Sequence, residues 1–242
     1  MALTVARPIE IILAVEHPDT PLSPRRILLG GCFLSALAAA VNTDFMIRLG
    51  VSVSHLTGDF SKVTIEANRN GLHWSTSVTL LLVTISGFVG GAAASGFFIH
   101  HPRIDVSRPY GRSIQGIGCA FLLAQAVMGR SQTVACFLAA GGCGFQNALA
   151  THYRGVVLRT THLTGLLTDL GQMIGMKLRG RSVDLWKITT PLALALSFTM
   201  GASAAALMRI ELHVPVLGWC GLAYLGGGLI WSGIKRWKRM SD

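Results

Sequence analysis

The sequence predicts an all-α, polytopic membrane protein, a bundle of transmembrane helices built from two related repeats. Of its 242 residues, 51% are hydrophobic and only 13% are charged, whereas soluble domains carry about 25% charged residues. The apolar residues gather in six runs that are long enough, or nearly so, to cross ~30 Å of hydrocarbon. In addition, the polar sequence His-Leu-Thr-Gly occurs once in each half of the chain.

Residues 1–26 are predicted to form a cytoplasmic N-terminal tail. Their short apolar stretch, residues 9–15, is interrupted by Glu10 and followed by prolines. A cleavable signal peptide needs a longer uncharged core, so we expect none here. The predicted transmembrane domain then covers residues 27–234, and a basic cytoplasmic C-terminus covers 235–242.

The six apolar runs are the predicted firm spans. They cover residues 27–47, 75–99, 113–129, 132–150, 188–208 and 215–234. Repeat one is 27–129 and repeat two is 132–234. Two further stretches, 51–71 and 156–177, contain the His-Leu-Thr-Gly sequences and are too polar to face lipid. We expect them to be either helices buried within the bundle, which gives eight crossings, or re-entrant segments, which leaves six.

Small residues recur every four positions along the spans. Span by span, they are Gly31, Ser35, Ala39 and Thr43; Gly87, Gly91 and Ser95; Ala140, Gly144 and Ala148; and Ser197, Gly201 and Ala205. Such ladders let helix backbones approach closely where lipid provides no hydrophobic drive for association. Gly87 and Gly91 also align with Ser197 and Gly201, 110 positions later, which supports the duplication.

The basic residues predict the orientation in the membrane. The chain carries 21 Lys and Arg against 11 Asp and Glu, a net charge of +10. They lie at the ends of the apolar runs, so we expect no nucleic-acid partner. With either six or eight crossings, most of them fall on the side of the termini, which the positive-inside rule places in the cytoplasm. The basic residues that anchor the C-terminus are Lys235, Arg236, Lys238 and Arg239.

Two polar stretches, residues 42–62 and 144–175, carry the candidate functional residues. Both contain an Asn, a Gly eight residues later, and then His-Leu-Thr-Gly. The residues predicted to line a substrate or ion pathway are Asn42, His55, Thr57, Gly58, Asp59, Gln146, Asn147, His162, Thr164, Gly165, Thr168 and Asp169.

These residue types suggest a site because charge in a bilayer is costly, about 2.5–3.5 kcal/mol at the centre. His55 and Asp59 are four residues apart, so on a helix they could form a hydrogen bond along one face. Gly58 and Gly165 could let a helix bend or unwind, and transporters coordinate ions with such breaks. Asp44, by contrast, lies near the end of its span, and we expect it to cap a helix or lie at the headgroup level.

The runs QNAL and RTTHLTGLLTDLG in the second stretch, and SHLTGD in the first, resemble the YoaK-like family of small multispanning bacterial membrane proteins. That family is catalogued as a domain of unknown function. The resemblance covers about residues 27–234 and implies a helical fold and a multi-pass location in the bacterial inner membrane, but no substrate. The chain departs from the family pattern, which has Asp where Asn42 stands and Thr-Gly-Asn where Thr57, Gly58 and Asp59 stand.

The leading hypothesis for function is passage of a small polar solute or ion. Proton coupling would use Asp59, Asp169 and the histidines of the two His-Leu-Thr-Gly sequences, His55 and His162. There is no nucleotide-binding loop and no nucleophile motif, and the five cysteines lack metal-ligand spacing. We therefore expect no cofactor, no metal and no catalytic residue. Two alternatives stay open: a membrane-embedded enzyme that uses the His/Asp cluster, and a structural or assembly subunit. The expected partners are the lipid bilayer and the unidentified solute, with a homo-oligomer left open.

Overall fold

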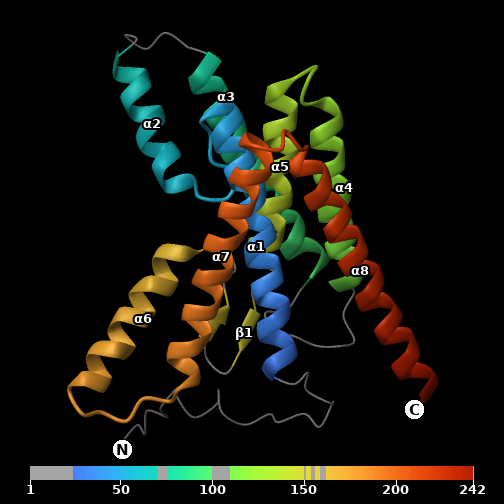
Figure 1. Cartoon of the computed structure of the whole chain (residues 1–242). Coiled ribbons are helices and arrows are strands. Elements are labelled where there is room, and N and C mark those ends of the chain that lie inside the picture. Colours follow the sequence, from blue (N-terminus) through green and yellow to red (C-terminus); the bar gives the residue numbers. More distant parts are fainter. Residues whose placement is uncertain are drawn as a thin grey trace, which may run out of the picture.

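The computed structural model describes residues 24–69, 76–99, 110–149, 151–153, 156–158 and 162–241 (Figure 1). In chain order the elements are α1 (Pro24–Leu49), α2 (Leu56–Arg69), α3 (Thr76–Phe98), α4 (Tyr110–Val127), α5 (Gln132–Ala148), β1 (Thr151–Tyr153), β2 (Val156–Leu158), α6 (Leu163–Leu178), α7 (Trp186–Ile210) and α8 (Val216–Ser241). The predicted helical architecture is confirmed. The antiparallel pair β1 and β2, in which Thr151 faces Leu158, was not predicted. The predicted tail lies outside the described residues as far as residue 23.

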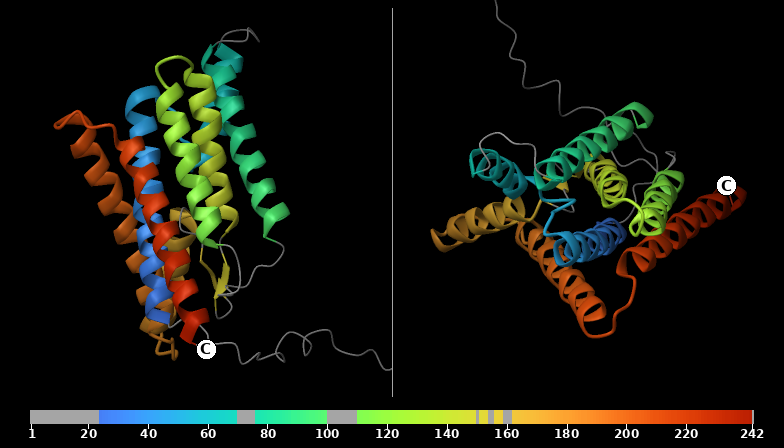
Figure 2. Two further views of the ribbon diagram at one scale, coloured as in Figure 1. Left: turned by 90° about the vertical axis from the view of Figure 1, so that its right-hand side faces the viewer. Right: turned by 90° about the horizontal axis from the view of Figure 1, so that it is seen from above.

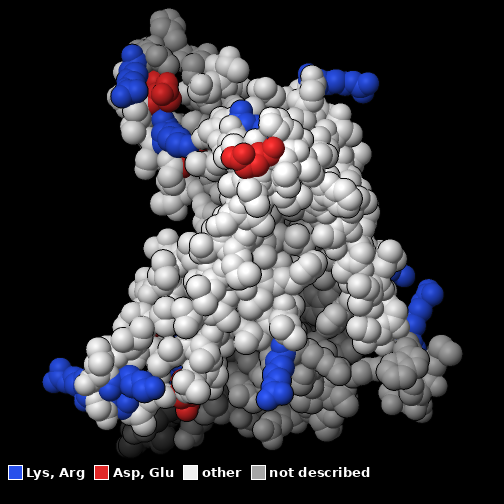
Figure 3. All heavy atoms as spheres, viewed as in Figure 1, with Lys and Arg blue, Asp and Glu red and all other residues white. Residues whose placement is uncertain are grey.

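Within the described residues, four helices are by length and composition long and apolar enough to cross a membrane. They are Ile27–Leu49, Thr76–Phe98, Trp186–Ile210 and Val216–Ile234. The other two predicted spans also form helices, α4 and α5, but these have only 18 and 17 residues. On the face seen in Figure 3, the charged side chains gather toward the upper and lower parts, and the surface between them is mostly uncharged. This distribution is typical of a protein that lies in a bilayer.

The long helices pack mainly in three pairs: α1 with α7, α3 with α5, and α4 with α8 (Figure 2). Contacts of α4 with α5 and of α1 with α8 join the pairs. The apolar core lies among α1, α4, α5 and α8, where Phe45, Phe121 and Tyr224 are fully buried. The rings of Phe121 and Tyr224 meet edge to face, with centroids 5.2 Å apart.

Glycines allow the close approach of the paired helices, as the small-residue ladders predict. A Cβ atom added at Gly91 of α3 would overlap the carbonyl oxygen of Gly141 on α5. A Cβ atom at Gly201 of α7 would overlap the carbonyl oxygen of Ala36 on α1 in the same way. Because the obstacle is backbone, these positions exclude every residue larger than glycine.

The two short helices do not lie within the bundle. Helix α2 packs only on α3, and α6 only on α7, among the larger contacts between described elements. Asp59 is the one fully buried described residue of α2, and Leu166 that of α6. The alternative that buries both segments within this chain's bundle is therefore wrong. In Figure 1 the two helices begin near mid-height and run away from each other, α2 upward and α6 downward.

Asp44 is fully buried near the ends of α1 and α7, and the backbone N–H of Leu217, in the first turn of α8, faces its carboxyl group, in line with the expected helix cap. Its Oδ1 atom lies 3.1 Å from Nε of Arg48 and 3.5 Å from Nε of Arg209 on α7. Nη2 of Arg48 also donates to Oε1 of Gln125 on α4, at 3.4 Å. The carboxylate tolerates burial because two guanidinium groups neutralise it, and the resulting network ties α1 to α4 and α7.

Candidate functional site

The turn after α1 is organised by the side chain of Asn42. Its Oδ1 atom accepts hydrogen bonds from Oγ of Ser52 at 2.8 Å, from N of Val53 at 3.0 Å and from N of Ser54 at 3.1 Å. The chain reverses just before, at Gly50, whose φ of +65° lies in the left-handed region that favours glycine. One amide oxygen thus satisfies three donors of a turn that would otherwise leave them unpaired.

Asp59, in the first turn of α2, closes the same turn from the other side. Its Oδ2 atom accepts from N of Ser52 at 3.0 Å, and its Oδ1 atom pairs with Nζ of Lys62 at 3.3 Å. Nζ of Lys62 also donates to the carbonyl oxygen of Gly50, at 2.7 Å. Asn42 and Asp59 therefore lie close together, since both bind Ser52. The partial positive charge at the N-terminal end of α2 also stabilises a carboxylate at this position.

His55 lies in the turn one residue before α2, so the predicted hydrogen bond with Asp59 along a helix face is wrong. Its backbone N donates to Oγ of Ser52 at 2.9 Å. Its ring meets Phe198 of α7 edge to face, with centroids 5.1 Å apart. Both oxygens of Asp59 are bound to Ser52 and Lys62. Within the described residues, the buried Nε2 atom of His55 has no hydrogen-bond partner.

His162 is exposed, one residue before α6, and is close enough to act electrostatically on His55. Burial lowers the pKa of His55, and the imidazole of His162 adds to the shift. The two His-Leu-Thr-Gly sequences, 107 positions apart, thus converge in the fold. The beginnings of α2 and α6 lie on the same side of the bundle in Figures 1 and 2.

The glycines of the two motifs do not break their helices. Gly58 lies inside α2 and Gly165 inside α6. A Cβ atom at Gly58 would meet nothing within 4 Å, whereas one at Gly165 would overlap the ring of His162. The prediction of an unwound Thr-Gly segment is therefore wrong. The turn precedes the motif instead, at Gly50, where the backbone has a positive φ; the matching Gly155 lies outside the described residues.

The threonines and Asp169 lie on exposed surface. Thr57 is exposed on α2, and Thr164, Thr168 and Asp169 are exposed on α6. Oγ1 of Thr168 donates to the carbonyl oxygen of Thr164, at 2.9 Å. This bond stays within one helix. Both hydroxyl groups lie on the exposed face of α6.

Gln146 and Asn147 lie near the end of α5. The amide of Gln146 is buried: its Nε2 atom donates to the carbonyl oxygen of Leu34 at 3.1 Å, and its Oε1 atom accepts from the hydroxyl of Tyr224. Gln146 therefore ties α5 to α1 and α8, and these contacts do not involve the histidines. Asn147 is half-buried.

Three residues of this site were missed in the sequence. Ser52 could have been suspected, because it lies in a Val-Ser-Val-Ser stretch too polar for a span end. Lys62 follows Asp59 by three residues, a helical spacing that favours an ion pair. Phe198 had no local signal, since it reaches His55 from a helix more than 100 positions away.

The stability of the fold is expected to decrease as the pH falls from 7.5 to 5.5. Folding lowers the pKa of His55, so below about pH 6.5 the unfolded chain binds more protons than the folded one. Thermal unfolding in detergent at both pH values measures the effect. His55→Gln should show a smaller pH dependence than the wild type, while His213→Gln, at an exposed histidine, should not. Equal pH dependence of the wild type and His55→Gln would contradict the prediction.

Among the described residues no group of three His, Cys, Asp or Glu could hold a metal ion. Comparison with curated proteins and with solved structures gives no match. A family model described as "Protein of unknown function (DUF1275)" matches residues 30–230. The matched region runs from α1 into α8 and includes both His-Leu-Thr-Gly sequences. The chain belongs to the DUF1275 family.

Proposed function

We propose that this protein is a membrane transporter or channel for a small polar solute or ion. The observation that carries the proposal is the buried Nε2 atom of His55, which has no hydrogen-bond partner among the described residues, at the start of α2 and on the same side of the bundle as the start of α6 with its equivalent His162. The resemblance to YoaK-like proteins supports a location in the bacterial inner membrane.

In this proposal six helices cross the bilayer and two enter it partway. Helices α4 and α5, with 18 and 17 residues, are at the short end of the range for a span. Helices α2 and α6 have 14 and 16 residues, about 21 and 24 Å at 1.5 Å per residue, and are too short and polar to cross. Their opposite directions in Figure 1 fit two re-entrant segments that enter from opposite sides.

Six crossings place both termini on one side, which the basic residues indicate is the cytoplasm. In support, α1 begins and α8 ends at the lower side of the bundle in Figure 1. A unique cysteine in a tag at either terminus should react with an impermeant maleimide only after the cytoplasmic side is opened. The untagged protein supplies the background from its own cysteines. Labelling of either tag in intact cells would overturn this topology.

We further propose that the two halves are inverted repeats. Helix α3 corresponds to α7 at a shift of 110 positions, and α1 to α5 at a shift of 105. Gly91 thus corresponds to Gly201, and Ala36 corresponds to Gly141. The contact of Gly91 with Gly141 in one half therefore has its equivalent in the contact of Gly201 with Ala36, and both are close contacts with the backbone. Three crossings in each half would invert one half relative to the other, as in many transporters.

The contact of α4 with α8 supports the same relation. Gly118 packs on Gly221, and a Cβ atom at Gly118 would lie 2.7 Å from the carbonyl oxygen of Gly221. Gly111 packs on Gly228, where the corresponding distance is 2.9 Å. At a shift of 110 positions Gly118 corresponds to Gly228, and Gly111 corresponds to Gly221. The two contacts are therefore equivalent, as is expected of helices related by a two-fold axis.

In the proposed pathway the two histidines contact the solute, and the turn around Ser52 holds His55 in place. The first turns of two helices supply unpaired N–H groups and a partial positive charge. Nε2 of His55, buried and without a partner among the described residues, can bind a polar solute or exchange a proton. Asp59 supports the turn, while Asp169 lies on the exposed face of α6, so proton coupling would depend on the histidines.

The test is uptake of ions and small polar metabolites by vesicles containing the purified protein, with and without a pH gradient. We expect uptake that His55→Gln and His162→Gln each reduce at least roughly tenfold, a loss of about 1.4 kcal/mol of stabilisation. His213→Gln is the matched control, because His213 lies in the turn between α7 and α8. Equal signals from protein-containing and empty vesicles for every solute would refute the proposal.

The same preparation separates the two alternatives. Chemical conversion of a lipid-soluble compound, lost in His55→Gln, would favour an enzyme. A partner that co-purifies in fixed proportion, together with no uptake, would favour an assembly subunit.

A further inference from the structure

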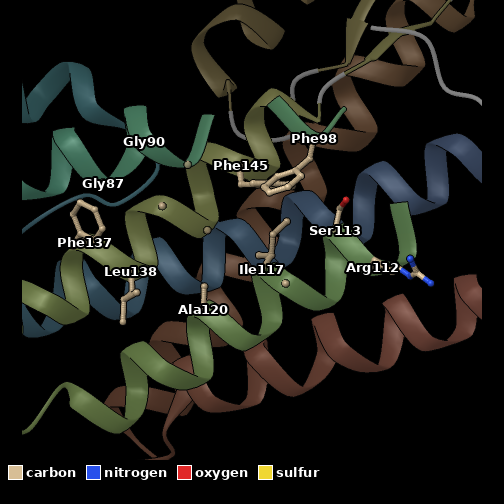
Figure 4. Close-up of a pocket in the computed structure, with 14 residues that line it drawn as sticks. Gly87, Gly90, Phe98, Arg112, Ser113, Ile117, Ala120, Phe137, Leu138 and Phe145 are labelled. Atoms are coloured by element: carbon tan, nitrogen blue, oxygen red, sulfur yellow. The ribbon is translucent and has the colours of Figure 1, made fainter. Parts of the chain in front are cut away.

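A groove of about 730 Å³ lies among α3, α4 and α5, away from the histidines. Its walls are glycines and apolar side chains, and among the described lining residues Arg112 and Ser113 are the only ones with polar side chains. Figure 4 shows Arg112 at one end of the groove, and Phe137 and Leu138 toward the other. The volume is within the range of ligand sites, about 300–1,000 Å³.

The groove has the depth of one bilayer leaflet. Along α3 it extends from Gly87 to Phe98, eleven residues apart, or about 16 Å at 1.5 Å per residue. Half of the ~30 Å hydrocarbon core is about 15 Å. The groove therefore matches an acyl chain in length.

Arg112 lies where a headgroup would be. It is exposed in the first turn of α4, and among the described carboxylates none forms an ion pair with it. The neighbouring Gly111 packs on Gly228, at the middle of α8 and six residues before its apolar part ends at Ile234. Arg112 thus lies toward the end of that apolar part, beyond which α8 carries the exposed Arg236. A guanidinium group in this position favours a phosphate.

We propose that this groove binds an anionic phospholipid of the surrounding bilayer, with an acyl chain along α3 and the phosphate on Arg112. Basic pockets between transmembrane helices bind anionic headgroups in this way. Gly90 and Gly116 keep the groove open, since a Cβ atom at either would meet nothing within 4 Å. This site is separate from the histidines and does not depend on the proposed transport.

The test is native mass spectrometry of the full chain taken from nanodiscs of equal phosphatidylglycerol and phosphatidylethanolamine. We expect the wild type to retain phosphatidylglycerol preferentially. Arg112→Gln should weaken its binding about fivefold, which corresponds to about 1 kcal/mol for one basic residue. Gly90→Leu should fill the groove and reduce the retained lipid at least as much. The matched controls are Arg179→Gln, at another exposed arginine, and Gly96→Leu, at an open glycine outside the groove.

Gly116→Leu fills the groove from α4 and provides a second test if Gly90→Leu does not fold. Equal retention of the two lipids by the wild type would overturn the proposal. Unchanged phosphatidylglycerol binding in both folded glycine variants would do the same. A dimer that the groove substitutions dissociate would identify a second copy as the occupant instead.

Discussion

Gly91→Leu and Gly201→Leu are each expected to prevent assembly of the folded bundle. At Gly91 the new Cβ atom would overlap the backbone of Gly141, and at Gly201 the backbone of Ala36. A side chain could rotate away, but a carbonyl group within a helix cannot, so the helices must separate. The cost should exceed the roughly 1–3 kcal/mol typical of overpacking. Because α3 with α5 and α1 with α7 are different contacts, either substitution alone should suffice.

The measurement is the yield of monodisperse protein in detergent and its melting temperature. Gly96→Leu is the matched control: Gly96 is on α3 as well, and a Cβ atom there would meet nothing within 4 Å. It should fold normally, which shows that leucine in α3 is not harmful in itself. Wild-type yield and melting temperature for both Gly91→Leu and Gly201→Leu would show that these glycines do not hold the helices together.

Exchanging Asn42 and Asp59 is expected to have the second-largest effect, with the double variant more stable than the single changes predict. Both side chains accept a hydrogen bond from Ser52: Asn42 from the hydroxyl of Ser52, and Asp59 from its backbone N–H. Asn42→Asp alone places two carboxylates around one serine, and their repulsion should destabilise the fold by up to about 3 kcal/mol. Asp59→Asn alone removes the charge opposite Lys62 and should cost about 1 kcal/mol.

In the double variant a single carboxylate remains between the two positions. Asp at 42 can accept the same three hydrogen bonds, and Asn at 59 can still accept from the N–H of Ser52. Chemical or thermal unfolding of all four proteins gives the interaction energy, which should be at least about 0.5 kcal/mol in favour of the double variant. Asp169→Asn, at an exposed carboxylate of α6, should change stability little. Additive effects of the two single substitutions would mean that the family departure at these positions is a coincidence.

The positions of the six predicted spans and of the close helix contacts follow from local features of the sequence. Helices form at all six predicted spans, because the length and hydropathy of a run depend only on neighbouring residues. The small-residue ladders correctly predicted close helix contacts at Gly91 and Gly201, because glycine within a span allows two backbones to approach closely. The pairing of Asn42 with Asp59 was also within reach, because the two are close in the chain.

Which distant segments lie together depends on the tertiary structure. It brings His162 to His55 and Phe198 to the same ring, and it uses Gln146 to join three helices instead of lining a pathway. It also buries Asp44, because Arg209 arrives from a helix that no local pattern connects to it. Periodicity and composition describe one segment at a time. The neutralisation of a buried charge, or the contact of a histidine ring with a phenylalanine, depends instead on how segments more than 100 residues apart pack against one another.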